Sequence, residues 1–528
     1  MTDATAVYRP LDASKQEFRL ARVYADGYGE IKILLDVFSL DSPPEYLALS
    51  YCWTEFPPTI QTTLNQLPFW IRPNLHDFLQ RFVEEGRTEW IYIDALCINQ
   101  ANVAERSSQV DIMGHIYRGA RKVVAWLGGH LPNDPRITAH HVEIEEALSA
   151  LHRASLSGQD LLTFTCQPNQ AGHRRKPLPI YSKVLFAFVS HTYWKRLWVV
   201  QELVLAQEFL IWCGRLHLTS YQLSVLISTM ENVFPKSKES CPNPWPHDYW
   251  QLSYVVRDRE APRQIMAITS ILHWRRDSHK HAYDICSAIN STAVLDCSLV
   301  HDHIFGIVGL TSSVIVADYS IPILELYLRV LAETLVDLMS PGPLLPKAST
   351  LDFLIPLYVF WENLLLSFGF SPLDPLVALT TTAVGLNLGL LAVEPKSLEG
   401  VAELNALENA FWTFPHYQLR LKQVFRMQRW GHRPSSVAKA FARFRDHVKI
   451  SIVNGRLERK VKKDANLTEP GEGGRTMPCS AWIELSKTIA REVIEAKNRQ
   501  VEERVARSKT YVPEEAEDSE RPAARKNY

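Results

Sequence analysis

The first 214 residues alternate short apolar runs with amphipathic segments, and this alternation constrains the fold more than any other feature of the chain. The apolar runs of strand length are residues 31–40, 46–51, 90–94, 122–127 and 209–213. Between them, apolar residues recur at the 3.6-residue helical spacing, as in the helix expected over residues 105–120. Apolar strands that alternate with helices are typical of a parallel sheet covered on both faces. The sequence therefore predicts an α/β domain.

Local signals place turns and helix ends within this pattern. Residues 41–44 (Asp-Ser-Pro-Pro) end the first apolar run, and residues 64–67 (Leu-Asn-Gln-Leu) have the composition of a tight turn. Asn74 precedes apolar residues at helical spacing, so we expect it to cap a helix. Glu105 and Arg118 lie at opposite ends of the next helix, where their charges complement the helix dipole. We assign structural roles to all of these residues.

Composition divides the chain into four parts. They are lead-in strands at residues 1–45, the α/β domain at 46–214 with an insertion at about 130–190, an α-rich region at 215–454, and a tail at 455–528. The tail is charged and interrupted by glycine and proline, which predicts disorder outside one amphipathic helix near residues 482–505.

The overall charge excludes a strong electrostatic attraction to nucleic acid or to anionic membranes. The chain has 57 basic and 58 acidic residues, a net charge of −1 and a pI near 7.0. Residues 420–463 are locally basic and interleaved with aromatic residues, so this stretch could hold nucleic acid or an acidic partner. A solvated helix face that neutralises the acidic tail is the simpler interpretation. We expect neither nucleic acid nor a membrane as a partner.

The sequence also bears on location. Residues 1–10 lack the apolar core of a secretory signal, and the eight cysteines form no Cys-x-x-Cys pair, which favours reduced thiols. Residues 375–393 are uncharged and approach membrane-spanning length, but three threonines, an asparagine and two glycines favour a buried helix. We expect a cytoplasmic protein.

Several common kinds of active site lack their motifs in this chain. The histidines and cysteines between residues 279 and 303 do not have zinc-ligand spacing, so no metal is expected. The sequence has no phosphate-binding loop, no His-Glu-x-x-His and no Gly-x-Ser-x-Gly. These absences disfavour the common NTPases, zinc proteases and serine hydrolases.

Glu202 is the sharpest candidate for a functional residue. It lies in a segment, residues 197–206, that is apolar on almost every side, and a helix of that kind is buried. A buried carboxylate must be paired, neutralised or exposed to a cavity. Two interpretations stay open: an ion pair, with Arg196 or another arginine, or a carboxylate that faces a ligand pocket with Trp198 one turn away on the same face.

Polar and aromatic residues also follow two of the strands. Asp94 ends one strand, at the edge where open parallel sheets bind ligands, and Asn99 and Gln100 lie in the loop that follows. The alternative is that such residues only fix their own loop by side-chain hydrogen bonds. Ser50 and Trp53 follow the strand before it, where a hydroxyl could donate to a sugar or phosphate and an indole could stack on a flat ring. For Trp53 the alternative is a lid on the core.

Four blocks of the chain resemble the fungal heterokaryon-incompatibility (HET) domain, a module linked to self/non-self recognition and programmed cell death. The blocks are residues 46–53, 90–100, 105–128 and 193–202, with weaker similarity at 302–310 and 318–320. Two departures bear on the loops: Thr54 replaces a usual glycine, and residues 299–301 (Leu-Val-His) replace a usual Asp-Pro-Arg.

HET domains are similar to TIR domains, whose sheet is flavodoxin-like and whose catalytic glutamate cleaves NAD. Residues 198–203 (Trp-Val-Val-Gln-Glu-Leu) resemble the helix that carries this glutamate, with Val199 in place of a cysteine. The resemblance implies that Glu202 is catalytic and that NAD is a substrate rather than a bound cofactor. It also implies that Ser50, Asp94 and either Trp53 or Trp198 orient the nucleotide. The alternative is a non-enzymatic adaptor that associates with itself or with another incompatibility or receptor protein.

Overall fold

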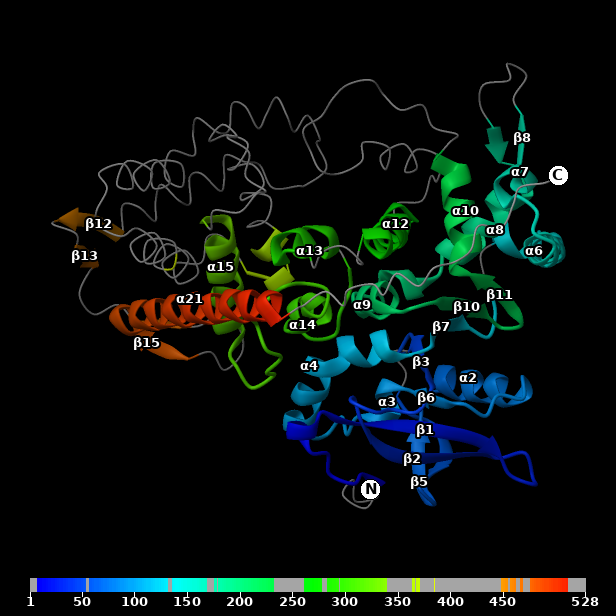
Figure 1. The fold of residues 1–528 in the computed structure, drawn as a ribbon, viewed down its shortest axis with the longest axis horizontal. Helices are drawn as coiled ribbons and strands as arrows, with labels where there is room; N and C mark the ends of the chain where they lie inside the picture. Colours follow the sequence, from blue (N-terminus) through cyan, green and yellow to red (C-terminus); the bar gives the residue numbers. More distant parts are fainter. Residues whose placement is uncertain are drawn as a thin grey trace, which may run out of the picture.

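The structure is a computed structural model of the 528-residue chain. It describes residues 7–53, 57–131, 135–168, 175–177, 179–231, 261–277, 283–293, 295–339, 363–365, 367–370, 384, 448–453, 456–461, 466–468 and 475–510. Figure 1 shows the β-rich N-terminal part of the chain beside a group of helices from its later part.

A nine-stranded sheet organises the N-terminal part. Its strands are β1 (Glu17–Ala25), β2 (Ile31–Ser39), β3 (Tyr46–Tyr51), β4 (Ile60–Leu64), β5 (Leu67–Ile71), β6 (Trp90–Tyr92), β7 (Lys122–Gly128), β10 (Phe209–Cys213) and β11 (Leu216–Thr219). Their order in space is β11-β10-β7-β3-β6-β1-β2-β4-β5. The four strands β6, β3, β7 and β10 are parallel to their neighbours in this group and have the 2-1-3-4 order of flavodoxin-like sheets. The prediction of an α/β fold is confirmed.

The sheet is mixed outside this parallel centre. Strand β1 is antiparallel to both β2 and β6, and the pairs β4–β5 and β10–β11 are antiparallel hairpins. Strands β2 and β4 pair in parallel as well. The sheet is therefore not parallel throughout, although a parallel sheet was expected, and the short links of the hairpins β1–β2, β4–β5 and β10–β11 leave no room for a parallel crossover. The residues that precede β3 form part of the same sheet.

Helices cover both faces of the parallel centre. Helix α2 (Pro73–Glu84) lies between β3 and β6 in the chain, and α4 (Val103–Gly119) lies between β6 and β7. These two crossovers run in opposite directions along the sheet, so right-handed connections place the helices on opposite faces. Helix α9 (Trp198–Leu205) packs beside α4, where a Cβ atom on Gly114 would lie 3.2 Å from Leu205.

Some local predictions are confirmed and others are wrong. Asn65 and Gln66 have φ values of 50° and 66° and connect β4 to β5, as the predicted tight turn requires. Asn74 is not the helix cap, because Pro73 takes the first helical position and moves the cap to Arg72. The Asn74 amide instead donates to the carbonyl oxygen of Cys52 at 2.9 Å.

The helix expected over residues 193–206 is interrupted. A 3-10 turn, η2 (Thr192–Lys195), precedes α9, and Arg196 between them is extended, with φ −77° and ψ 134°. Arg196 forms a parallel β-bridge with Asp296, and the backbone N–H of Leu197 donates to the Asp296 carbonyl oxygen at 2.9 Å. A distant segment thus sets the direction in which α9 leaves η2.

The insertion and the later part of the chain are mainly helical where they are described. The insertion contains α5 (Pro135–Thr138), α6 (His141–Leu156), α7 (Leu161–Thr165), the hairpin β8 (Cys166–Pro168) and β9 (Arg175–Pro177), and α8 (Pro179–Val189). The later helices are α10 (Ser220–Glu231), α12 (Ala261–Asp277), α13 (Ile285–Thr292), α14 (Asp302–Val308), α15 (Ile323–Met339) and α21 (Cys479–Thr510). Helix α21 includes residues 482–505, where the sequence predicts an amphipathic helix.

Two notable stretches fall largely outside the described residues. Residues 375–393 are described only at Val384, and the basic stretch 420–463 only within β12 (Val448–Val453) and β13 (Arg456–Val461). Those two strands pair with each other, so the helix expected for this stretch does not extend through them. The remaining strands, β14 (Asn466–Thr468) and β15 (Thr476–Pro478), form another hairpin. In the described part of the chain, every helix is too short or too polar to cross a membrane.

Candidate functional site

A buried carboxylate lies at the carboxyl end of strand β3. Glu202 of α9 is 2% exposed and accepts a hydrogen bond from the hydroxyl of Ser50, which is 1% exposed. The Tyr193 hydroxyl from η2 lies 2.5 Å from the same Ser50 oxygen. All six residues of β3 are buried, so Ser50 reaches Glu202 without contact with solvent. The structure thus joins two of the predicted site residues, 152 positions apart in the chain.

The electrostatics of Glu202 depend on burial and on one arginine. Burial raises the pKa of Glu202 from 4.5 to about 7, and the nearby Asp94 adds to the rise, while Arg196 and the Ser50 hydrogen bond oppose it. The Arg196 guanidinium donates to the Tyr51 carbonyl oxygen. Within the described residues Glu202 has no direct ion pair, so Arg196 acts on it only through space. The buried Glu202 carboxyl therefore has a hydrogen bond from Ser50 and a raised pKa, and no salt bridge within the described residues.

Asp94 and Trp53 lie together at the neighbouring strand end. Asp94 is the first residue of the short helix α3 (Asp94–Cys97), which directly follows β6, and it accepts a hydrogen bond from Trp53 Nε1 at 3.3 Å. Burial raises the pKa of Asp94, although Arg196 opposes the rise. The Arg72 guanidinium lies over the Trp53 ring, 5.0 Å from its centroid. Both aromatic and charged groups therefore meet at this edge of the sheet.

Two buried hydroxyls near these groups have no hydrogen-bond partner within the described residues. They belong to Tyr51 and Tyr92, which are 2% and 0% exposed. Burial raises the pKa values of these phenols, and the charges of Asp94 and Glu202 add to the rise. An unpaired buried hydroxyl is costly, and a bound ligand or water would supply the missing partner.

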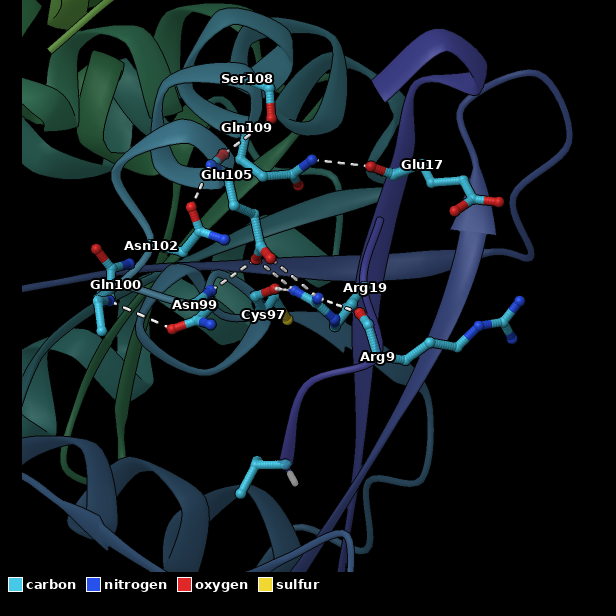
Figure 2. Close-up of polar contacts among 12 residues, drawn as sticks. Arg9, Glu17, Arg19, Cys97, Asn99, Gln100, Asn102, Glu105, Ser108 and Gln109 are labelled. Carbon is cyan, nitrogen blue, oxygen red and sulfur yellow. Dashed lines mark hydrogen bonds and ion pairs between the residues drawn. The ribbon is translucent and has the colours of Figure 1, made fainter. Parts of the chain in front are cut away.

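Asn99 and Gln100 fix the loop that carries Asp94. The backbone N–H of Asn99 donates to Glu105 Oε1 at 2.8 Å, and its side chain accepts from the N–H of Ala101 at 3.3 Å. Gln100 Nε2 donates to the Asp94 carbonyl oxygen at 3.1 Å. Both side chains thus make the loop-stabilising bonds of the structural alternative. Figure 2 shows Asn99 and Gln100 in this loop, with the Asn99 backbone bonded to Glu105.

A buried ion pair anchors the same loop, and sequence reasoning missed it. Arg19 Nη1 lies 2.6 Å from Glu105 Oε1, with the two side chains 1% and 9% exposed. The Arg19 guanidinium also donates to the carbonyl oxygens of Cys97, at 2.9 Å, and Arg9 (Figure 2). The helix-dipole explanation of Glu105 is therefore incomplete. The available signal was Arg19 itself, a charged residue between the apolar Phe18 and Leu20 of β1.

The remaining candidate, Trp198, lies on the side of α9 that meets α14. It is half-buried, and a Cβ atom on Gly306 of α14 would lie 3.5 Å from its ring. The sequence analysis missed its neighbour Gln201, which is 1% exposed and accepts a hydrogen bond from the N–H of Gly309 at 3.1 Å. The signal that could have identified Gln201 is that it is the other polar residue, next to Glu202, in an otherwise apolar helix.

The described residues hold no cluster of histidine, cysteine or carboxylate side chains that could ligate a metal. The site is instead a set of hydrogen-bonded polar groups between the ends of β3 and β7. From β3 the chain leads through α2 to β6, and from β7 it leads through α9 to β10, on the other side of the sheet. In doubly wound folds this switch point is the usual place for ligands. The fold and the cluster together define a doubly wound α/β domain with a candidate ligand site at its carboxyl edge.

Comparisons with known proteins agree on one family. The family described as "Heterokaryon incompatibility protein (HET)" matches residues 46–202, so this part of the chain is similar to a HET domain. A curated relative, "Heterokaryon incompatibility protein 6, OR allele" of Neurospora crassa, is 26% identical over 223 residues, which cover 37% of this chain and 32% of the relative. The chain thus spans about a third of the length of that relative. No solved structure matches the chain.

Proposed function

We propose that this chain acts in heterokaryon incompatibility as a signalling protein for programmed cell death, and that its HET domain cleaves NAD. The role in incompatibility is supported by the similarity of residues 46–202 to a HET domain and by the name of the Neurospora crassa relative. The resemblance of residues 198–203 to the catalytic helix of TIR domains supports the chemistry.

The single observation that carries the proposed reaction is the setting of Glu202. A carboxylate held beside the ribose would stabilise the positive charge that develops as nicotinamide leaves. The Ser50 hydroxyl fixes the orientation of this carboxylate. The Glu202 pKa of about 7 makes the ionised carboxylate available near neutral pH. The hydroxyls of Tyr51 and Tyr92, which have no hydrogen-bond partner among the described residues, offer hydrogen bonds to a polar ligand.

The groups around Trp53 and Asp94, at the carboxyl edge of the sheet, are suited to bind the pyrophosphate and the base of a dinucleotide. Trp53 presents an aromatic ring held by Asp94, and Arg72 lies over that ring as a half-buried cation. A guanidinium is a suitable partner for a pyrophosphate, and an indole for a flat base. We assign nucleotide orientation to these three residues.

The test compares nicotinamide release from NAD by the purified full-length protein and by its Glu202→Gln variant. We expect the variant to be slower by about 10²-fold or more, the loss typical of a removed transition-state contact. Glu208→Gln is the matched control, because Glu208 has a side chain that is 68% exposed and lies just beyond the same helix. A folded Glu202→Gln protein that cleaves NAD at the full rate would refute the reaction.

The proposed reaction also predicts a pH profile. Because burial raises the pKa of Glu202 to about 7, the ionised form gains population as the pH rises through that value. Nicotinamide release should therefore increase between pH 6 and pH 8, about one unit on either side of that pKa. A rate that falls over this interval would contradict the role assigned to the carboxylate.

One observation favours a second candidate, a non-enzymatic adaptor that associates with itself. Glu202 and Ser50 are only 2% and 1% exposed, so a substrate reaches them only after the structure opens. The adaptor predicts oligomers whose size depends on concentration, measured by light scattering, and cell killing that survives Glu202→Gln. Loss of killing in that variant would favour the enzyme.

A further inference from the structure

Helix α21 is fastened to the described core by a buried ion pair. Lys497 of α21 is 8% exposed, and its Nζ lies 2.7 Å from Glu333 and 2.9 Å from Asp337, both on α15. Glu333 is fully buried. Breaking a buried ion pair by removing one partner is far more damaging than losing a surface pair, because a charge is left without compensation. Figure 1 shows α21 crossing α15, against which it packs.

The same ion pair holds the segment that connects α14 to α15. Glu333 accepts hydrogen bonds from the Ser313 hydroxyl at 2.7 Å and from the N–H of Val314 at 3.0 Å. From α21, Lys497 and Gln500 both donate to the Ser312 carbonyl oxygen, at 3.3 and 3.1 Å. The backbone of residues 312–314 is therefore bonded from two helices at once.

This segment contacts the helix that carries Glu202. The N–H of Gly309, three residues before Ser312, donates to Gln201 Oε1. The approach is so close that a Cβ atom on Gly309 would lie 2.7 Å from that oxygen. A Cβ atom on Gly114 of α4 would also lie only 3.4 Å from the Gly309 Cα. Little space remains for α9 to move while residues 309–314 are held.

We propose that α21 positions α9, and thereby the Glu202 carboxylate, through a relay that runs from Lys497 and Glu333 along residues 309–314 to Gln201. Lys497 is in this sense a positioning residue, more than 290 positions away from Glu202 in the chain. The relay itself depends only on the contacts above, and only its consequence for NAD cleavage rests on the proposed function.

Amide hydrogen exchange in the full-length protein tests the relay. Lys497→Met should speed exchange across residues 198–206 by roughly tenfold, the order of coupling seen between connected elements. Lys487→Met is the matched control on α21 and should leave α9 unchanged, because in the part of the chain that the structure describes Lys487 pairs with Glu484 of the same helix alone. Lys497→Arg keeps the cation and should restore most of the protection.

Exchange in the β4–β5 hairpin, at the far edge of the sheet, separates a local effect from a general loss of stability. Faster exchange in α21 with α9 unchanged, or an equal rise in the hairpin, would overturn the relay. If Lys497→Met does not fold, Gln500→Ala removes a weaker bond to the same Ser312 oxygen and should give a smaller rise at residues 198–206. No rise in that variant would overturn the relay as well.

The two proposals fail in different ways. Under the proposed function, Lys497→Met lowers nicotinamide release. A wild-type protein that releases no nicotinamide refutes the reaction but leaves the exchange result intact. Unchanged exchange at α9 refutes the relay whether or not NAD is cleaved.

Discussion

Replacing Glu202 by glutamine should change how the stability of the protein depends on pH. The pKa of this carboxyl rises from 4.5 to about 7 on folding, so the folded protein binds its proton more tightly than the unfolded chain does. A raised pKa stabilises the folded state fully below pH 4.5, and this contribution is lost as the pH rises through about 7. Glutamine does not titrate and loses nothing over this range.

The structure sets the size of the effect. A tenfold difference in proton affinity corresponds to about 1.4 kcal/mol, so the interval between the two pKa values amounts to about 3 kcal/mol. Between pH 4.5 and pH 8 the wild type should therefore lose about 3 kcal/mol of unfolding free energy relative to Glu202→Gln. Above pH 7 the variant should be the more stable protein, provided that the two are similar at low pH.

Urea unfolding of both proteins, followed by circular dichroism at a series of pH values, measures this difference. Val200→Ala is the control, because Val200 is a buried neighbour on α9 that carries no titratable group. It should lower stability by the same amount at every pH. A constant separation between wild type and Glu202→Gln from pH 4.5 to pH 8 would refute the argument that burial holds the proton on this carboxyl.

Three further changes test the fold by the same unfolding measurement. Arg19→Met leaves Glu105 buried without its partner and should cost about 3–5 kcal/mol, most of which the double variant Arg19→Met/Glu105→Met should recover; a loss below about 1 kcal/mol would contradict the burial of the pair. Gly214→Ala should destabilise by more than about 1 kcal/mol, because φ is +55° and the new Cβ would lie 2.4 Å from the Gly129 carbonyl oxygen; a neutral result would contradict this approach. Gln66→Gly should stabilise by roughly 1 kcal/mol, because it removes a side chain from a left-handed turn position; destabilisation would mean that the turn differs.

The sequence predicted helices and strands well where the apolar pattern and the turn or end signals agree. The apolar runs at residues 46–51 and 209–213 coincide with β3 and β10, since both are central strands whose burial on two faces gives an unbroken apolar signal. Asn74 was assigned a local role by its residue type, but its amide reaches across to Cys52. A capping preference describes only the neighbouring backbone, so it could not foresee that contact.

Contacts between distant residues account for the rest. Ser50 and Glu202 were each predicted as site residues, but their hydrogen bond depends on how α9 packs on β3, which a sequence pattern does not contain. The ion pair of Arg19 with Glu105 was missed because each residue alone has an ordinary local explanation. Only the order of strands in space brings β1 next to the loop after β6.

The position of strands β1 and β10 bears on how the α/β domain can be excised for expression. Residues 46–202, the span matched by the family, include β3, β6 and β7 but neither β1, which pairs with β6, nor β10, which pairs with β7. A fragment cut at those limits would expose an unpaired strand on each side, and such edges template aggregation. The smallest fragment with a complete sheet begins before Glu17 and ends after Thr219.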